Sequence, residues 1–559
     1  MAITINSDTL IPTESSFKVS AGPGAGKTHW LSLHIKNVLA HGRSLGISRK
    51  IACISYTNVG VETILERIPN DNSLVDVCTI HSFLYNQVVK PFLYIDAEKW
   101  GIDINNLRVS PSEPFQTKAF ANIIIGDIKA LWVNPNSLVK GLIKCTWRSR
   151  AGNTIKFTPR YLIKNEDKYG HETKYSVPQL AYDKFVELKW GKGILSYDDV
   201  LYLAIEILKQ HPYIYRILAA RYPYFFVDEF QDTIPTIMDF IKSLAQYGVK
   251  IGVVGDKAQT IYDFIGASVA NFDSFTVQGQ IDYEIHGNRR SSPEIVNLLN
   301  CIRTDFVQTP IGTTSGIKPI FLVGDKLNAY QKAIEISCTD DVHSLAFPNI
   351  IANSLKYKTE ADVNIKGLID SDFDSDFQRA TEIKIYLKAV EYAFNNDFKE
   401  AWFHLDLLDN NREHTISVLR MLLNHRNEYK DGSLYDFYEF VKHNINQKLT
   451  LLKKGRIKDF YLSHSYLEMA LSMKVSDCQA MHKTIHKAKG EEYDNILLII
   501  NEPADIKVLS SPDLSNNSTD RVYYVGMSRA KNSLFINVES ISEESKLILQ
   551  KLPIDIIEL

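Results

Sequence analysis

The sequence predicts an α/β protein with two parallel, doubly wound sheets, each interrupted by a mainly helical insertion. Three observations support this fold class. Short apolar runs alternate with helical stretches in the first half of the chain, a glycine-rich loop joins one run to a helix, and a second set of apolar runs lies near the end. A chain of 559 residues is long enough for several domains.

The strands of the first sheet are predicted by a β-rich run that ends at Ala21 and by four continuous apolar runs. The four runs lack the alternation of polar and apolar residues that a half-exposed strand shows, which favours strands buried on both faces. They are residues 51–56, 75–80, 224–229 and 251–256.

A second sheet is predicted from three later runs, residues 317–323, 495–500 and 533–538. The chain leaves the β/α pattern twice, and both stretches are rich in helical periodicity. We therefore predict two α/β domains, each built from two segments around an insertion. The first domain comprises 1–90 and 191–287 around insertion 91–190, and the second comprises 288–355 and 475–559 around a reduced insertion 356–474.

Composition limits the possible partners. There are 63 Lys and Arg residues against 66 Asp and Glu residues, so a generally basic coat for nucleic acid is excluded and any such binding must be local. No apolar run approaches the roughly 18 residues of a membrane span. The first residues show no basic start followed by an apolar stretch. We therefore expect a cytoplasmic protein with no membrane partner.

Residues 21–28, AGPGAGKT, fit a permissive phosphate-binding loop in which Ala21 replaces the usual first glycine. Glycines let backbone N–H groups converge on phosphates, and the N-terminus of the following helix adds a partial positive charge. A lysine here pairs with the β- and γ-phosphates, and a hydroxyl ligates Mg²⁺. The predicted nucleotide ligands are Gly22, Gly24, Ala25, Gly26, Lys27 and Thr28.

The sequence VDEFQD at residues 227–232 follows a buried apolar run, so its carboxylates emerge at the carboxyl end of a strand. Open α/β sheets bind ligands at that edge. We predict that Asp228 holds Mg²⁺ and that Glu229 orients and deprotonates the attacking water. Taken alone, such a pair more often marks the start of a helix.

Nine short segments, taken together and in order, resemble the motifs of the UvrD/Rep/PcrA family of superfamily 1 DNA helicases. VDEFQDT, residues 227–233, resembles the family's Walker B motif, and the acidic stretch LSYDDVL, residues 195–201, precedes it. The matching segments are 21–28, 54–58, 79–83, 195–201, 227–233, 253–267, 288–295, 484–494 and 523–531.

This resemblance implies two RecA-like P-loop domains with ATP between them and single-stranded DNA across the top. It implies that Gln259 contacts the γ-phosphate and that Arg290 and Arg529 reach it from the second domain. Glu492 is implied to hydrogen-bond the ribose. Arginine side chains at the γ-phosphate stabilise the negative charge that spreads over the phosphoryl oxygens in the transition state. Without the motif context, a surface salt bridge is the more common role for either arginine.

The family binds DNA by aromatic stacking and by polar contacts to the backbone. The resemblance places aromatic residues at Tyr56, Tyr262 and Phe264. It places backbone contacts at Thr57, Asn58, His81, Thr484 and His486. Each of these residue types, taken alone, is more often a core residue or a helix cap.

A basic segment in the first insertion, residues 140–164, supports DNA binding independently. It has seven Lys and Arg residues, no acidic residue and interleaved aromatic residues, a mixture that suits a groove for single strands. Our candidates within it are Trp147, Arg148 and Arg150. A solvated basic hairpin remains the alternative.

Several of the positions that contact the nucleobase in the family carry different residues in this sequence. Residues 1–16 lack the glutamine that reads adenine, His29 replaces an arginine, and Arg289 replaces the aromatic residue that stacks on the base. An arginine plane stacks less specifically than an aromatic ring. We therefore predict relaxed nucleotide choice, with ATP or another NTP or dNTP as substrate and Mg²⁺ as cofactor.

Two functional hypotheses follow. The first is a DNA-dependent ATPase that moves 3′→5′ along single-stranded or tailed DNA as a translocase or helicase. The second is a DNA- or nucleotide-sensing ATPase subunit that regulates a partner nuclease, similar to the helicase-like subunit of Gabija-type anti-phage systems. The stretch between the motifs at 288–295 and 484–494, which governs unwinding in the family, is shorter than in full-length members, so strong duplex unwinding is in question. Ile265 replaces an arginine and Glu491 replaces a leucine in the motifs that couple hydrolysis to DNA.

Overall fold

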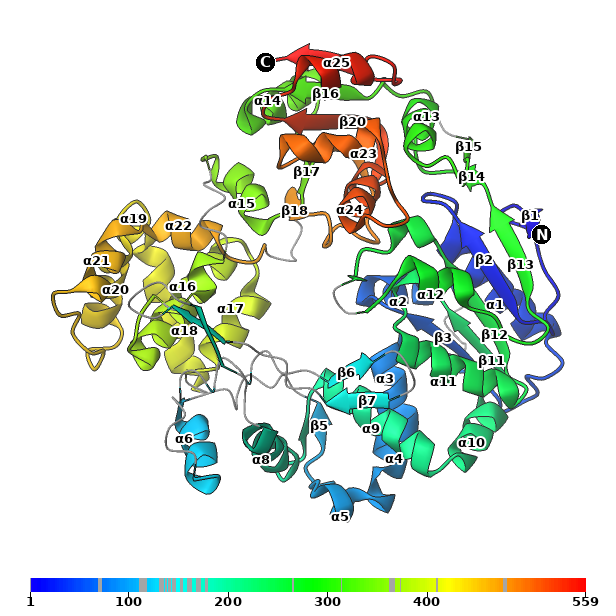
Figure 1. The fold of residues 1–559 in the computed structure, drawn as a ribbon, viewed down its shortest axis with the longest axis horizontal. Helices are drawn as coiled ribbons and strands as arrows, with labels where there is room; N and C mark the ends of the chain where they lie inside the picture. The colour runs from blue at the N-terminus through cyan, green and yellow to red at the C-terminus, as the bar shows by residue number, and fades with distance from the viewer. Residues whose placement is uncertain are drawn as a thin grey trace. The chain divides into compact units, whose positions relative to one another are not determined.

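The structure is a computed structural model. It describes residues 2–68, 73–109, 118–129, 135, 138, 142, 147–150, 154–157, 163–166, 172–175, 179–263, 266–312, 314–360, 367–371, 373–408, 411–475 and 480–559. The chain forms two compact units, Met1–Gly287 and Asn288–Leu559. Each unit contains one large parallel sheet with helices around it, which confirms the predicted fold class (Figure 1). The finer division into four domains stays a prediction.

The sheet of the first unit has the strand order β1-β13-β2-β12-β11-β3-β4, and the pairs with a described register are all parallel. Apolar runs correctly predicted β2, β3, β4, β11 and β12. Two short strands at one edge, β1 and β13, were not predicted. The bounds are β1 Ile3–Ile5, β2 Phe17–Ala21, β3 Ile51–Ser55, β4 Val75–Thr79, β11 Tyr224–Val227, β12 Lys250–Gly255 and β13 Ile281–Ile285.

Strands β3 and β11 are fully buried and β12 is buried except at Lys250, as their continuous apolar sequences predict, whereas β2 alternates between buried and half-buried residues. The predicted burial of β4 on both faces was wrong, because every residue of this edge strand is only half-buried. The α-helices of the unit outside the first insertion are α1 Lys27–His41, α2 Asn58–Arg67, α3 Ile80–Leu84, α4 Lys90–Phe92, α9 Tyr197–Gln210, α10 Tyr213–Arg221, α11 Pro235–Gln246 and α12 Val269–Ser274.

The sheet of the second unit has the order β18-β17-β19-β20-β16-β21, again with parallel pairs. Its strands are β16 Ile320–Val323, β17 His343–Ala346, β18 His482–Thr484, β19 Tyr493–Ile499, β20 Ala530–Val538 and β21 Asp555–Glu558. The three predicted strands correspond to β16, β19 and β20. Around them lie α13 Pro293–Ile302, α14 Lys326–Ser337, α15 Asn349–Tyr357, α23 Lys507–Ser510, α24 Ser518–Met527 and α25 Glu543–Leu549.

The first insertion contains more strand than predicted. Its helices are α5 Ala97–Trp100, α6 Lys118–Asp127 and α8 Gln179–Trp190. The basic segment forms the antiparallel pair β6 Trp147–Arg150 and β7 Thr154–Phe157, and a second pair, β8 Ile163–Glu166 and β9 Glu172–Tyr175, follows. Two described stretches of the basic segment, residues 147–150 and 154–157, therefore pair as antiparallel strands.

The second insertion is helical over its described residues and has its own apolar core. Its helices are α16 Phe377–Phe394, α17 Phe398–Leu405, α18 Arg412–Asn424, α19 Arg426–Tyr429, α20 Leu434–Asn444, α21 Arg456–Ser463 and α22 Tyr466–Leu471. Within the described part of the chain, no helix combines the length and the apolar character needed to cross a bilayer.

Close packing in the first sheet gives a test of the fold. A Cβ atom at Gly252 in β12 would overlap the Phe17 ring and lie 2.6 Å from a ring carbon of Phe226. We expect Gly252→Ala to destabilise the first unit by about 1–3 kcal/mol because the strands on either side cannot move apart. Thermal unfolding followed by circular dichroism measures the loss. Gly126→Ala in α6 is the matched control, since an added Cβ there meets nothing within 4 Å; an equal loss in both variants contradicts the packing.

Candidate active site

The glycine loop leaves the carboxyl end of β2 and leads directly into α1. Gly24 and Gly26 have φ values of 68° and 79°, a left-handed backbone that other residues rarely adopt. Gly26 is the N-cap residue of α1, and no side chain caps this helix end. The first turn of α1 therefore presents its N–H groups without a competing side-chain acceptor, as an anion site requires.

Lys27, the first residue of α1, lies over the loop and is only 9% exposed. Its Nζ donates to the carbonyl oxygens of Ala21 and Gly22 at 3.4 Å each. These contacts hold the positive charge at the place where the loop amides converge.

Thr28 and Asp228 lie 200 residues apart in the sequence and meet at the edge of the sheet. The Thr28 hydroxyl donates to Oδ2 of Asp228 at 2.9 Å. Burial, with a further contribution from the neighbouring Glu229, raises the pKa of Asp228 to about 6. A hydroxyl and a buried carboxylate side by side are hard oxygen donors that fit Mg²⁺, which takes its remaining ligands from phosphate and water.

Glu229 adopts an unusual backbone conformation for a residue with a side chain, with φ at 52°. Such a conformation costs about 1–3 kcal/mol and is found most often at functional sites. Gln231 holds this turn, because its Nε2 donates to Glu229 and its Oε1 accepts from the backbone N–H of Asp256 at 3.0 Å. Asp256 in turn accepts from Nε2 of Gln259 at 2.8 Å.

The Glu229–Gln231–Asp256–Gln259 chain, here called the glutamine relay, joins the ends of β11 and β12. Both ends of this chain, Glu229 and Gln259, were predicted as site residues, whereas its two middle members, Gln231 and Asp256, were not. Their signal was available, because both lie at or near the ends of predicted strands within the matched motifs.

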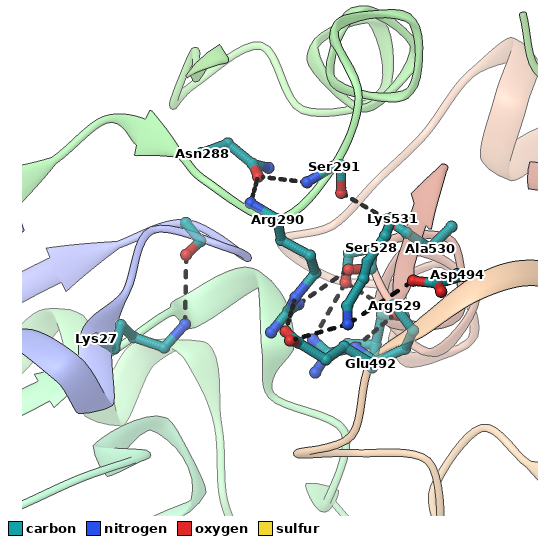
Figure 2. A network of polar contacts seen from close by, with 12 residues as sticks. Lys27, Asn288, Arg290, Ser291, Glu492, Asp494, Ser528, Arg529, Ala530 and Lys531 are labelled. Carbon is teal, nitrogen blue, oxygen red and sulfur yellow. Dashed lines mark hydrogen bonds and ion pairs between the residues drawn. The ribbon is translucent and has the colours of Figure 1, made fainter. Parts of the chain in front are cut away.

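In the second unit, Arg290 lies against Glu492. Its Nε donates to Oε2 of Glu492 at 2.8 Å, and its Nη1 donates to the carbonyl of Ser528 at 3.0 Å (Figure 2). Lys531 approaches the other oxygen, Oε1, at 3.4 Å. Burial alone raises the pKa of Glu492, but Arg290 and Lys531 outweigh it, so the pKa lies below its ordinary value.

Arg529 follows α24 and is 3% exposed. Its Nε donates to the carbonyl of Val525 at 3.2 Å, and its Nη2 donates to the Ser528 hydroxyl at 3.2 Å. Arg290 and Arg529 are thus both held by Val525 or Ser528, where α24 leads into β20, through contacts within the second unit.

Two domain families match this chain in sequence. The UvrD/REP helicase N-terminal domain matches residues 5–279, and the UvrD-like helicase C-terminal domain matches residues 378–540. The chain belongs to the UvrD-like helicase family. The membership predicted from the motifs is therefore confirmed, and two RecA-like units agree with it.

Several curated proteins are similar to this UvrD-like chain. The Gabija protein GajB of Bacillus cereus is 26% identical over 326 residues, which cover 52% of this chain and 47% of the relative. The ATP-dependent DNA helicase PcrA of Staphylococcus aureus is 24% identical over 356 residues, which cover 59% of this chain and 43% of the relative. The matched region thus spans less than half the length of these relatives.

The DNA-contact candidates of this UvrD-like chain in the first unit differ in accessibility. Asn58 is exposed, whereas Tyr56, His81 and Tyr262 are half-buried. The Thr57 hydroxyl accepts from the N–H of Gly60 at 3.0 Å and caps α2. Their roles stay predictions.

Tyr262 lies among acidic groups at the carboxyl edge of the first sheet. Burial, together with Asp232 and Glu229, raises its pKa to about 12. The Tyr262 hydroxyl therefore stays protonated at neutral pH and can donate a hydrogen bond. Phe264 and Ile265 lie outside the described residues.

Strand β6 carries Trp147, Arg148 and Arg150, and the structure describes only the backbone of these three residues.

In the second unit, Thr484 is buried at the end of β18, whereas His486 is half-buried. The His486 ring stacks on Phe347, with centroids 5.6 Å apart and an angle of 27° between the planes. Phe347 directly follows β17 and is 37% exposed. Phe347 was not predicted, because its strand, HSLA, is too short to be recognised from the sequence.

The positions near the predicted nucleobase are polar and exposed. His29 lies 3.2 Å from Oδ1 of Asp8 in the turn after β1, and Arg289 is exposed at the start of the second unit. Neither position provides the flat apolar surface on which a purine stacks selectively.

Proposed function

We propose that this protein is a Mg²⁺-dependent ATPase driven by single-stranded DNA, which it uses as a 3′→5′ translocase or helicase. The observation that carries this proposal is the 2.9 Å contact between Thr28 and Asp228, which joins the phosphate loop to the carboxylate motif in a UvrD-like chain. ATP is the expected fuel, with other NTPs and dNTPs as possible substitutes. We place the protein in the cytoplasm.

In this proposal the loop amides and Lys27 hold the β- and γ-phosphates. Thr28 and Asp228 hold Mg²⁺, which supplies positive charge to the phosphate oxygens when bound. Glu229 accepts the proton of the attacking water. The strained turn at Glu229 fixes the carboxylate, and fixed groups need little reorganisation during the reaction.

Coupling to DNA is assigned to the glutamine relay. Its hydrogen bonds link Glu229 to Gln259, so a change at the γ-phosphate moves the segment that carries Tyr262. We propose that Arg290 and Arg529 complete the site by acting on the same phosphate.

A second candidate function is supported by the similarity to the Gabija protein GajB. In that case the ATPase senses DNA or nucleotide and regulates a partner nuclease, with little unwinding of its own. Strand displacement on a 3′-tailed duplex distinguishes the two, because only the motor separates the strands.

Two substitutions test the proposed chemistry. We expect Lys27→Ala to abolish ATP hydrolysis together with tight nucleotide binding, because it removes the charge that holds the phosphates. Glu229→Gln should lower turnover by at least about a hundredfold while nucleotide stays bound, since only the proton acceptor is lost. Steady-state hydrolysis with single-stranded DNA and equilibrium binding of a fluorescent ATP analogue measure the two effects. Wild-type turnover in Glu229→Gln contradicts the assigned base.

The Phe347–His486 stack predicts a DNA contact in the second unit. We expect Phe347→Ala to weaken single-stranded DNA binding between about fivefold and a hundredfold, because one stacked base contributes about 1–3 kcal/mol. Fluorescence anisotropy with a labelled oligonucleotide measures the affinity. Phe398→Ala, another exposed phenylalanine of this unit at 46%, is the control; equal affinity of the two variants removes Phe347 from the interface.

Nucleotide choice is the third test. The polar, exposed side chains of His29 and Arg289 predict KM values for ATP, GTP and dNTPs within roughly tenfold of one another, since a polar site gains little from any one base. Hydrolysis assays over a range of each nucleotide give these values. A hundredfold preference for ATP shows that a specific adenine contact exists.

A further inference from the structure

Glu492 is surrounded by cations of its own unit. Its Oε2 accepts from Nε of Arg290 at 2.8 Å, and its Oε1 lies 3.4 Å from Nζ of Lys531 (Figure 2). Lys531 also lies 3.9 Å from Asp494. Both oxygens of the Glu492 carboxylate are therefore engaged within the second unit, and each faces a different cation.

Arg290 is held at both ends by contacts within its own unit. At the backbone, its N–H and that of Ser291 both donate to Oδ1 of Asn288 at 3.0 Å. At the guanidinium, Nε binds Glu492 and Nη1 binds the Ser528 carbonyl at 3.0 Å. The side chain is 16% exposed, so little freedom remains.

The contacts to Glu492 and Ser528 use the Nε–H and one Nη1 hydrogen of the Arg290 guanidinium. A guanidinium has five N–H donors in a rigid plane. With Nε and one Nη1 hydrogen occupied, the remaining donors form a fork of fixed direction, which suits two oxygens of a phosphoryl group.

We propose that Glu492 is a positioning residue for Arg290 and that Lys531 supports it by holding the second carboxylate oxygen. This inference rests on the proposed function, because it takes Arg290 to act on the transferred phosphoryl group. It differs from the role that the family resemblance implies for Glu492, a hydrogen bond to the ribose. Lys531 had no assigned role.

The physical reason is preorganisation. A free arginine side chain loses about 2 kcal/mol of rotamer entropy when it is fixed, and a residue that is already fixed loses little of this at the moment of reaction. A bare carboxylate beside Arg290 can also draw the guanidinium away from phosphate. Lys531 shares the charge of Glu492 and so weakens that competition.

Kinetics separate positioning from ribose binding. If Glu492 acts through Arg290, Glu492→Ala lowers kcat about tenfold to a hundredfold, changes KM for ATP less than threefold, and affects ATP and 3′-deoxy-ATP equally. The double variant Glu492→Ala/Arg290→Ala then hydrolyses no more slowly than Arg290→Ala alone. Lys531→Met lowers kcat severalfold and adds nothing to Glu492→Ala. Glu539→Ala, an exposed carboxylate of the same unit outside this network, is the control.

Two results overturn the proposal. One is a raised KM with unchanged kcat, together with lost discrimination against 3′-deoxy-ATP, which identifies a ribose contact. The other is additivity of the Glu492 and Arg290 substitutions, which shows that the two side chains act independently.

A direct measurement of Arg290 keeps this test separate from the proposed function. In protein labelled with ¹⁵N-arginine, the Nε–H signal of Arg290 is assigned by its loss in Arg290→Lys. We expect slow solvent exchange of this proton in the wild type and at least tenfold faster exchange in Glu492→Ala, whereas Glu539→Ala leaves it unchanged. Equal exchange in all three proteins overturns the positioning role even where hydrolysis is normal. Absence of DNA-stimulated hydrolysis in the wild type, with a protected Nε–H, rejects the proposed function instead.

Discussion

Parallel pairing of the central strands is the constraint on which the nucleotide site depends. In the first sheet β2, β11 and β12 run in the same direction, so their carboxyl ends lie at one edge. Lys27, Asp228 and Gln259 come shortly after these three strands. Residues spread over more than 200 positions are thereby brought to one place by backbone hydrogen bonds, and the loops only have to orient their side chains.

That convergence has an electrostatic cost, because it places two adjacent carboxylates in a poorly solvated turn. Thr28, which donates to Asp228, and the nearby ammonium of Lys27 offset part of the cost, yet the pKa of Asp228 is still raised to about 6. A nearby cation stabilises the ionised form of a carboxyl group whose pKa has been raised by burial. In the proposed function, the burial that raises the pKa of Asp228 therefore favours a cation beside its ionised form.

The sequence predicts features that follow from periodicity or strand ends better than those that depend on tertiary contacts. Strands β3, β11 and β12 were predictable because their continuous apolar runs have one stable location, between two layers of helices. Strands β17 and β18 are short and carry histidines, so pattern alone cannot separate them from loops. Likewise, the meeting of Thr28 with Asp228 follows from topology, whereas the stack of Phe347 on His486 depends on side-chain packing.

The contact between Arg290 and Glu492 shows why a motif alone cannot assign every role. A resemblance gives each residue one partner outside the protein, phosphate for one and ribose for the other. The structure shows that the two residues, 202 positions apart, are partners of each other. A buried or half-buried guanidinium needs an acceptor at all times, not only when nucleotide is bound, since an unpaired charge in that position is costly. The acceptor that stabilises the resting side chain then also determines the direction of its free donors, so stability and catalytic geometry are set by the same carboxylate.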